Sequence, residues 1–337
     1  MSGAAERLSL EAARALATAA LGQAGGVPSG IAASVAAALV AAEAEGQAGH
    51  GFSRLSDYAA QYRSGKINRA AQIQVHERGP ASLSIDADLG FAYPAMDAAL
   101  AAGLPVAEAQ GIAVMAIGNS HHCGALSVQV EKIAARGLIG LMVANAPKAI
   151  APYGASRPIF GTNPIAFATP RPDGPPLVID LSISQVARGK VMAAKKAGEA
   201  IPLGWALDAE GQPTTDPEAA LAGTMVPIGG AKGTALALIV ELLAAAFTGS
   251  AFSKDAGSFF TAEGKPPSVG QTMIALRPDA ETGYLDRVGA LLAEISAMDG
   301  VRLPGDRRRA AIDAAAREGL TIPGHLLAQA RAMAEGR

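Results

Sequence analysis

Apolar residues recur every three or four positions at both ends of the chain and gather into short runs in its middle. The first pattern predicts helices over residues 8–22, 28–46 and 54–64. The second is typical of buried strands, because short apolar runs rich in Val and Ile suit a strand better than a helix. We expect strands at 73–75, 81–85, 112–117, 139–144, 165–168, 177–180 and 268–276. Two helices are expected between them, at 92–111 and 124–136.

The second half of the chain carries four further patterns. Residues 195–226 are rich in Gly, Pro and Asp and predict a long ordered loop with little regular structure, of the kind that covers a site. Residues 233–247 are almost uncharged and predict a buried helix. Residues 307–335 predict a charged helical tail. Residues 282–298 predict an amphipathic helix, whose apolar stripe consists of Leu285, Val288, Leu291, Leu292 and Ile295.

Helical ends around a strand-rich middle indicate an α/β protein in three parts. We expect an N-terminal helical segment (1–70), a sheet-containing region (71–280) and a C-terminal helical segment (281–337) that packs with the first.

Composition narrows the classes of function. Half of the 337 residues are apolar and the formal net charge is −2, which argues against nucleic acid as the main partner. The single cysteine, Cys123, excludes an internal disulfide framework and a cysteine-rich zinc site and suits a reducing cytosol. No apolar run is long enough for a bilayer, and the N-terminus is unlike a signal peptide. We therefore expect a cytoplasmic protein with no membrane partner.

Two segments place histidines where acid–base chemistry is possible. His50 lies between two glycines, and Arg54 follows four residues later, so a helical turn would put a proton-transferring group and a carboxylate-binding group on one face. The alternative is a helix-end histidine with a surface arginine. His121 and His122 are adjacent and point apart on a strand or turn, so we expect one structural histidine and one facing a site. Their spacing does not favour a metal, and none is expected.

Two other segments could meet an anion. Gly229-Gly230-Ala231-Lys232-Gly233 precedes an apolar helix and suits either a phosphate cradle or a structural turn. Arg307, Arg308 and Arg309 oppose the dipole of the helix that they begin, unless an anion lies nearby. They predict either a solvated basic turn or a grip on the 2′-phosphate of NADPH. The usual GxGxxG dinucleotide fingerprint is missing.

Seven ordered segments resemble the type-2 malate/L-lactate dehydrogenase family, and the resemblance covers nearly the whole chain. The segments are GHGFSRLSDY (49–58), GNSHHCGALS (118–127), IAPYGASRPIFGTNPIAFATP (150–170), VIDLSISQVARGK (178–190), IPLGWALDAEGQPTTDP (201–217), PIGGAKGTALALIVELL (227–243) and DGVRLPGDRR (299–308). The resemblance implies a homodimer that uses NADPH or NADH on 2-oxo/2-hydroxy acids or cyclic ketimine carboxylates. It also implies a non-Rossmann nucleotide domain with a mixed, mostly antiparallel sheet, which would explain the missing fingerprint.

Within the family, the short form HHCGAL looks most like the branch that reduces Δ1-piperideine-2-carboxylate and Δ1-pyrroline-2-carboxylate. The resemblance makes His50 the proton donor, Arg54 the carboxylate-binding residue, and Thr162, Arg188 and Gly189 substrate contacts. The positions that it assigns to the nucleotide are His122, Cys123, Gly124, Ala125, Leu126, Asp180, Leu181, Ser182, Lys232, Gly233, Gly305, Asp306, Arg307, Arg308, Arg309, Ala310 and Ala311.

Two positions depart from the ketimine reductases. Gly49 stands where the family has a serine before the histidine, and Lys190 stands where the acidic member of the Ser-His-Asp relay is expected. A lysine near His50 would lower the pKa of the histidine, so Lys190 is a possible modulator and the relay is not carried over. We expect NADPH-dependent reduction of cyclic ketimine carboxylates, giving L-proline and L-pipecolate. The alternatives are a 2-hydroxy-acid dehydrogenase (malate, lactate, ureidoglycolate or sulfolactate type) and a catalytically silent nucleotide-binding protein.

Overall fold

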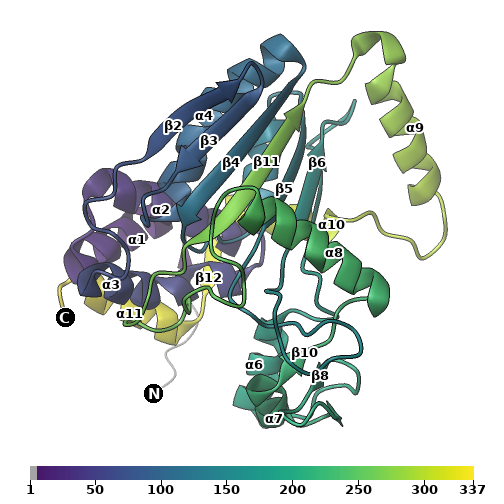
Figure 1. Cartoon of the computed structure of the whole chain (residues 1–337). Helices are drawn as coiled ribbons and strands as arrows, with labels where there is room; N and C mark the ends of the chain where they lie inside the picture. Colours follow the sequence, from purple (N-terminus) through teal and green to yellow (C-terminus); the bar gives the residue numbers. More distant parts are fainter. Residues whose placement is uncertain (1–5) are drawn as a thin grey trace.

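A seven-stranded mixed sheet forms the centre of the computed structural model, which describes residues 6–337 (Figure 1). The strand order is β2-β3-β4-β11-β5-β6-β7, and only the β3–β4 pair is parallel. The predicted α/β class with a mostly antiparallel sheet is confirmed. The strands are β2 (Gln74–Gly79), β3 (Ser82–Asp86), β4 (Ile112–Ser120), β5 (Ile139–Ala144), β6 (Ile165–Thr169), β7 (Leu177–Leu181) and β11 (Val269–Leu276).

Helices cover both faces of this sheet. The helices α4 (Ala92–Gln110) and α5 (Leu126–Ala134) pack on one face, against β4 and against β5 and β6. The helix α8 (Ala231–Glu241), continued by a π-helical turn over Leu242–Ala246, lies on the other face (Figure 1).

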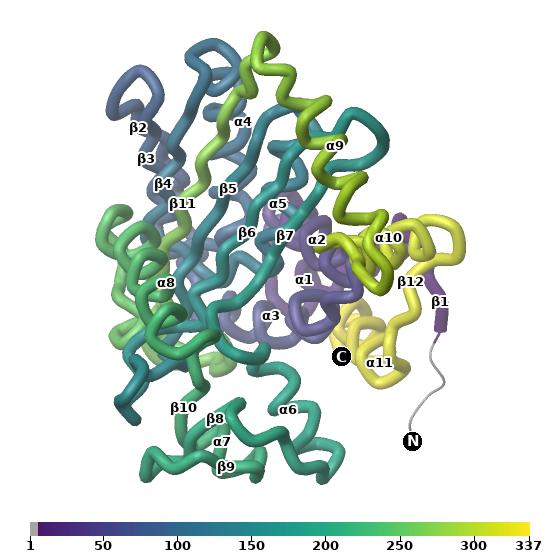
Figure 2. Tube along the Cα trace, turned by 90° about the vertical axis from the view of Figure 1, so that its right-hand side faces the viewer, coloured from purple at the N-terminus to yellow at the C-terminus, as the bar shows by residue number. Residues whose placement is uncertain are grey.

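The two terminal segments lie side by side (Figure 2). The helices α1 (Leu10–Gly25), α2 (Ser29–Ala44) and α3 (Leu55–Ser64) share a hydrophobic core with the C-terminal α11 (Gly324–Ala334) and with the sheet. The short strand β1 (Glu6–Leu8) pairs antiparallel with β12 (Leu320–Ile322).

The tail between 307 and 335 is interrupted, although we expected a continuous helical pattern. The helix α10 (Asp306–Glu318) ends before Gly319, whose φ of +84° and closeness to the Leu8 carbonyl leave no room for a side chain. Pairing with β1 converts the next three residues into β12, a contact that local periodicity does not encode.

Residues 188–225 form a small lobe instead of the predicted irregular loop over 195–226 (Figure 2). Ala206, Ala220 and Met225 bury themselves against Ile150 and Ile183 in a second hydrophobic core. These apolar positions are too widely spaced to show a period in the sequence. The elements of the lobe are α6 (Arg188–Ala197), β8 (Ala206–Leu207), β9 (Pro213–Thr214), α7 (Pro217–Ala222) and β10 (Thr224–Met225).

The prediction that the apolar helix over 233–247 is buried is wrong in part. Val240 and Ala244 pack against Val143 of the sheet and Ala237 is buried in the second hydrophobic core, but a second face of α8 and its π-helical turn is exposed. We call this exposed set the α8 face; it consists of Leu236, Leu238, Ile239, Leu242 and Phe247, between 41% and 54% exposed.

The position of the amphipathic helix α9 (Tyr284–Ser296) also differs from our expectation that residues 281–337 pack with the N-terminal segment. Its Tyr284 hydroxyl is 2.7 Å from the hydroxyl of Thr169 at the end of β6, and its Gly289 lies against Pro172. It therefore follows the sheet rather than the N-terminal helices, and none of its residues is fully buried. No helix within residues 6–337 combines the length and the apolar character that a membrane span requires.

Candidate active site

His50 and Arg54 lie on two successive 3₁₀ turns, Ala48–His50 and Phe52–Arg54, between α2 and α3. Buried Glu43 accepts a hydrogen bond from the Phe52 amide at 2.8 Å, and Arg54 Nε donates to the Gly49 carbonyl at 2.7 Å. A Cβ at Gly51 would lie 1.9 Å from Glu43 Oε2, so a side chain there would displace the carboxylate that holds the Phe52 amide. The turn that carries both predicted residues is thus fixed from inside the protein.

The imidazole of His50 is half-buried and stacks on the ring of His122, with 5.3 Å between centroids and 24° between planes. Its Nδ1 is buried and has no hydrogen-bond partner among residues 6–337. Burial, and then the positive charge of Arg54, lower the pKa of His50 to about 4. His50 is therefore neutral at pH 7.

The role of His50 as the proton donor stays a prediction, because this neutral state is that of the protein without substrate or nucleotide. An imidazole with a pKa of about 4 is mostly without its second proton near neutral pH, so its free ring nitrogen can serve as a hydrogen-bond acceptor or base. The charge that lowers its pKa belongs to Arg54, whereas Lys190 is exposed on α6 and is not among the causes of the shift.

His122 belongs to this cluster, although we predicted it as a nucleotide contact. Its Nδ1 is 2.6 Å from the hydroxyl of Tyr58, which is 3.1 Å from that of Tyr93. Burial and Arg54 hold the pKa of His122 well below its usual value, while burial raises that of Tyr58. His121 is the structural histidine of the pair, since its Nε2 meets Gln61 Oε1 at 2.7 Å inside the protein.

Two phenylalanines that sequence analysis missed complete the cluster. The Phe259 ring lies 4.8 Å from that of His122, and the Arg54 guanidinium carbon lies over the Phe260 ring, 4.8 Å from its centroid. The available signal was a pair of adjacent aromatic residues in a Gly- and Ser-rich segment of a chain with only eight phenylalanines.

Three of the segments predicted to bind the nucleotide meet at one edge of the sheet. Asp180, in β7, accepts a hydrogen bond from the Ser127 amide in the first turn of α5, at 2.9 Å. Gly305, which precedes α10 with a φ of +88°, lies against the Val178 carbonyl of β7. The segments 122–126, 180–182 and 305–311 are thereby brought together. Cys123 is buried within the first, and burial raises the pKa of its thiol to about 12.

The start of α8 joins the same region through Ile183. The Ile183 amide donates to the Thr162 carbonyl and its carbonyl accepts from the Ile228 amide, each at 2.8 Å. Gly229 and Gly230 have positive φ, and Lys232 is exposed. A helix start that presents amides and a lysine beside a glycine turn fits a phosphate group, so Lys232, Gly233 and the neighbouring Thr162 would suit the nucleotide and substrate.

The arginine cluster is used differently from our prediction. Arg308 pairs with Glu45 at 2.6 Å and with Glu131 at 2.5 Å, and Arg309 pairs with Asp313. The two carboxylates that hold Arg308 come from the end of α2 and from α5, far away in the sequence. Arg308 is therefore occupied within the chain, while Arg307 is exposed to solvent.

The predicted substrate contacts Arg188 and Gly189 lie on α6 in the small lobe. Arg188 donates to the Leu221 carbonyl at 3.4 Å, and burial lowers its pKa. No contact between these two residues and His50 or Arg54 occurs in the described part of the chain. The described residues also contain no group of three or more His, Cys, Asp or Glu suited to a metal ion.

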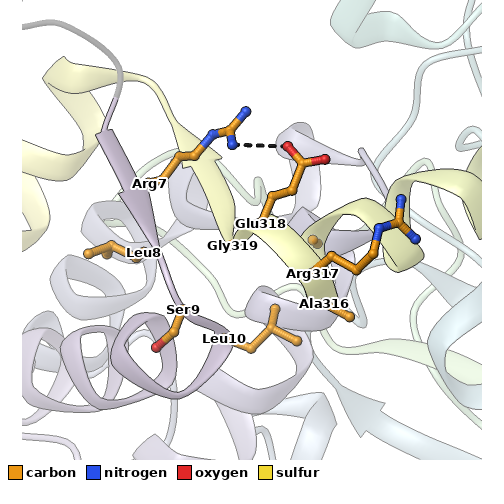
Figure 3. A pocket seen from close by; sticks show the side chains of 9 residues that line it. Arg7, Leu8, Ser9, Leu10, Ala316, Arg317, Glu318 and Gly319 are labelled. Atoms are coloured by element: carbon orange, nitrogen blue, oxygen red, sulfur yellow. Dashed lines mark ion pairs between the residues drawn. The ribbon is translucent and has the colours of Figure 1, made fainter.

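The surface hollow of about 310 Å³ in Figure 3 lies elsewhere, between β1 and the end of α10. Arg7 and Glu318 form an ion pair of 2.9 Å at its wall, and Arg317 also lines it (Figure 3). None of the predicted site residues lines this hollow.

Comparison with known proteins agrees with this architecture. Residues 8–330 match the pattern of the malate/L-lactate dehydrogenase family. The chain is 51% identical to a (2R)-3-sulfolactate dehydrogenase (NADP(+)) of Chromohalobacter salexigens over 98% of both chains. It is 42% identical to a Δ1-pyrroline-2-carboxylate/Δ1-piperideine-2-carboxylate reductase of Pseudomonas aeruginosa, over 82% of this chain and 84% of the relative. A Δ1-piperideine-2-carboxylate reductase from Pseudomonas syringae superposes with a TM-score of 0.92 at 35% identity, covering 97% of this chain and 99% of that structure. The chain belongs to the malate/L-lactate dehydrogenase family and is an oxidoreductase that uses a nicotinamide cofactor.

Proposed function

We propose that this enzyme uses NADPH to reduce cyclic ketimine carboxylates of the Δ1-pyrroline-2-carboxylate and Δ1-piperideine-2-carboxylate type. The observation that carries the proposal is a neutral His50 beside the guanidinium of Arg54, which in turn contacts the Phe260 ring. The bound nicotinamide would supply the hydride.

The chain's own residues have matching roles. The Nε of Arg54 is engaged by Gly49, which leaves the Nη1–Nη2 edge for a bidentate carboxylate. A cyclic ketimine is basic enough to carry its own proton on nitrogen, so its reduction needs no acid. A neutral His50 accepts the hydrogen bond of that N–H, whereas a protonated histidine would repel the cation. The low pKa of His50 suits this substrate, which brings its own proton.

A second candidate is oxidation of a 2-hydroxy acid such as sulfolactate, favoured by the 51% identity to a sulfolactate dehydrogenase. A neutral His50 would accept the hydroxyl proton as hydride leaves the same carbon. A sulfonate brings a second negative charge, which would need a cation besides Arg54.

Steady-state assays of both substrate classes with both nucleotides separate the candidates. We expect kcat/KM for the cyclic ketimines to exceed that for sulfolactate and 3-sulfopyruvate by at least tenfold. Faster turnover of the sulfonates would establish the second candidate and overturn the first. Nucleotide binding with no turnover of any of these compounds would indicate a catalytically silent member.

The preference for NADPH is part of the proposal. A relative that covers the whole chain carries NADP(+) in its name, and Arg307 is the exposed member of the arginine cluster at the nucleotide edge. We assign the 2′-phosphate to Arg307 rather than to Arg308, which two carboxylates already hold.

We further propose a homodimer in which the α8 face packs on a second copy of the chain. Five large apolar side chains on one helix form a patch of the kind that marks protein interfaces. Ile239→Asp should shift sedimentation at low micromolar concentration from dimer to monomer. Leu203→Asp, at a position 69% exposed in the small lobe, is the matched control and should leave the dimer intact. A monomeric unmodified protein, or an Ile239→Asp dimer, would contradict this interface.

A further inference from the structure

Residues 257–266 form a loop that is bonded to the end of α3, and we call it the aromatic loop. Lys66, only 4% exposed, directs its ammonium at the carbonyls of Ser258, Thr261 and Glu263 at 2.7, 2.8 and 3.2 Å. It also lies 3.1 Å from the Thr261 hydroxyl. No carboxylate pairs with Lys66 in the part of the chain that the structure describes, so the charge of this lysine is satisfied by the loop itself.

Two side chains of α3 itself hold the same loop. Gln61 Nε2 donates to the Phe259 carbonyl at 2.8 Å, and Ser64 Oγ donates to the Ala262 carbonyl at 2.6 Å. At the neck of the loop a Cβ on Gly257 would lie 2.1 Å from the Lys265 carbonyl, so the two ends of the loop are in contact. An irregular segment with this many backbone bonds to a helix has a defined conformation.

The bonds position two aromatic rings against the reacting groups. Phe259 is buried and packs on His121 and His122, while Phe260 remains 48% exposed with its ring over Arg54. A large apolar ring that is held in place yet half exposed leaves one side free for another group to cover.

We propose that Phe260 is a specificity-determining residue that favours flat ring-bearing carboxylates over carboxylates without a ring, and that Lys66 is its positioning residue. The inference rests on the proposed function, because it takes Arg54 as the carboxylate-binding group. A carboxylate bound to the Nη1–Nη2 edge lies in the plane of the guanidinium, and conjugation keeps a C=N or C=O group next to it in that plane. A substrate ring held beside Arg54 would then meet the Phe260 ring, which lies 4.8 Å from the guanidinium carbon, on one side and leave its other side for hydride.

Binding measurements test the proposal without requiring turnover. Calorimetry in the presence of NADP⁺ compares pyrrole-2-carboxylate, a flat ring acid, with oxamate, a flat acid without a ring. Phe260→Ala should weaken binding of pyrrole-2-carboxylate about five- to twentyfold, since the ring contact is lost, and that of oxamate less than twofold. Phe252→Ala is the matched control: Phe252 is 41% exposed and takes part in none of the ring contacts around Arg54 in the described residues. Arg54→Ala should abolish binding of both acids.

Lys66→Met tests the positioning role. It should weaken binding of pyrrole-2-carboxylate about threefold or more relative to that of oxamate. Lys254→Met, at an exposed lysine paired with Asp255, should not. If Lys66→Met does not fold, Ser64→Ala removes one of the loop bonds and should show the same selectivity on a smaller scale.

Equal loss of both ligands in Phe260→Ala would overturn the proposal, because Phe260 would then act only through Arg54. Unchanged binding of the ring acid, or no binding of either acid by the unmodified protein, would overturn it as well. Tight, Phe260-dependent binding without turnover of any ketimine would contradict the proposed function and leave this inference standing.

Discussion

The turn around His50 and the segment from Gly305 to Ala311 both place arginines where we expected an anion, and the structure treats them differently. Arg54 gives one N–H to the Gly49 carbonyl, has an aromatic ring over its face and makes no ion pair within residues 6–337. Arg308 is 12% exposed and held by two carboxylates, one of them almost fully buried. A guanidinium without a carboxylate partner can bind a ligand, whereas one that is already neutralised holds helices together. The predictions below test this distinction in order of expected effect.

The largest effect is expected for His50→Ala with a 2-hydroxy acid as substrate, and the size of the effect should depend on the substrate. Oxidation of a 2-hydroxy acid should lose about 10²–10⁴ in kcat, the usual range for a lost base. Reduction of a cyclic ketimine should lose about tenfold or less, because the substrate nitrogen already carries its proton. In the unmodified enzyme the active form is the neutral imidazole, so activity should be lost only as pH falls through about 4, with no step attributable to His50 between pH 6 and 8. A loss above 10² for the ketimine at every pH would restore His50 as an obligatory proton donor.

Arg308→Ala should destabilise the protein by about 3–5 kcal/mol, the usual result of leaving a buried carboxylate unpaired. Glu45, which would lose its partner, also accepts hydrogen bonds from Ser127 and Gln47 and cannot turn to solvent. Urea unfolding measures the change. Arg309→Ala, which removes a more exposed pair with Asp313, should cost about 1 kcal/mol or less. Equally small changes in the free energy of unfolding of both variants would contradict a structural role for Arg308, and with it the distinction from Arg54.

Arg54→Lys should raise KM for the carboxylate substrate about tenfold or more and change kcat less, since a point charge does not replace the bidentate edge. Its unfolding free energy should stay close to that of the unmodified protein, because Arg54 makes no ion pair in the described chain. A folded variant with unchanged KM would remove Arg54 from the carboxylate site.

Arg307→Ala should have the smallest effect, a loss of about tenfold in kcat/KM with NADPH and almost none with NADH. The measurement is the ratio of kcat/KM with NADPH to kcat/KM with NADH. Arg302→Ala, at another exposed arginine before α10, is the control. An unchanged ratio would show that the whole segment is architectural, like Arg308.

Local pattern sufficed for the elements that bury one face within their own length. The helices α1 to α4 and the strands β3, β5, β6 and β11 lie within a few residues of their predicted bounds, because period and composition express which face is buried. The nearby pair His50 and Arg54 was likewise visible, since four residues on one turn bring two side chains together.

The small lobe, β12 and the exposure of the α8 face depended on contacts that no local window contains. Sparse apolar residues of the lobe find Ile150 and Ile183, three tail residues find β1, and an apolar helix leaves one face exposed.

By itself, the sequence determined the family, the mixed α/β fold and the two residues at the centre of the candidate site. Only the tertiary structure decided their chemical state: burial beside Arg54 makes His50 neutral, Phe260 covers the guanidinium, and Glu45 and Glu131 occupy Arg308. The reason is physical. The identity of a residue fixes what its side chain can do, but its charge and its free hydrogen-bonding edges depend on groups that folding brings from elsewhere in the chain.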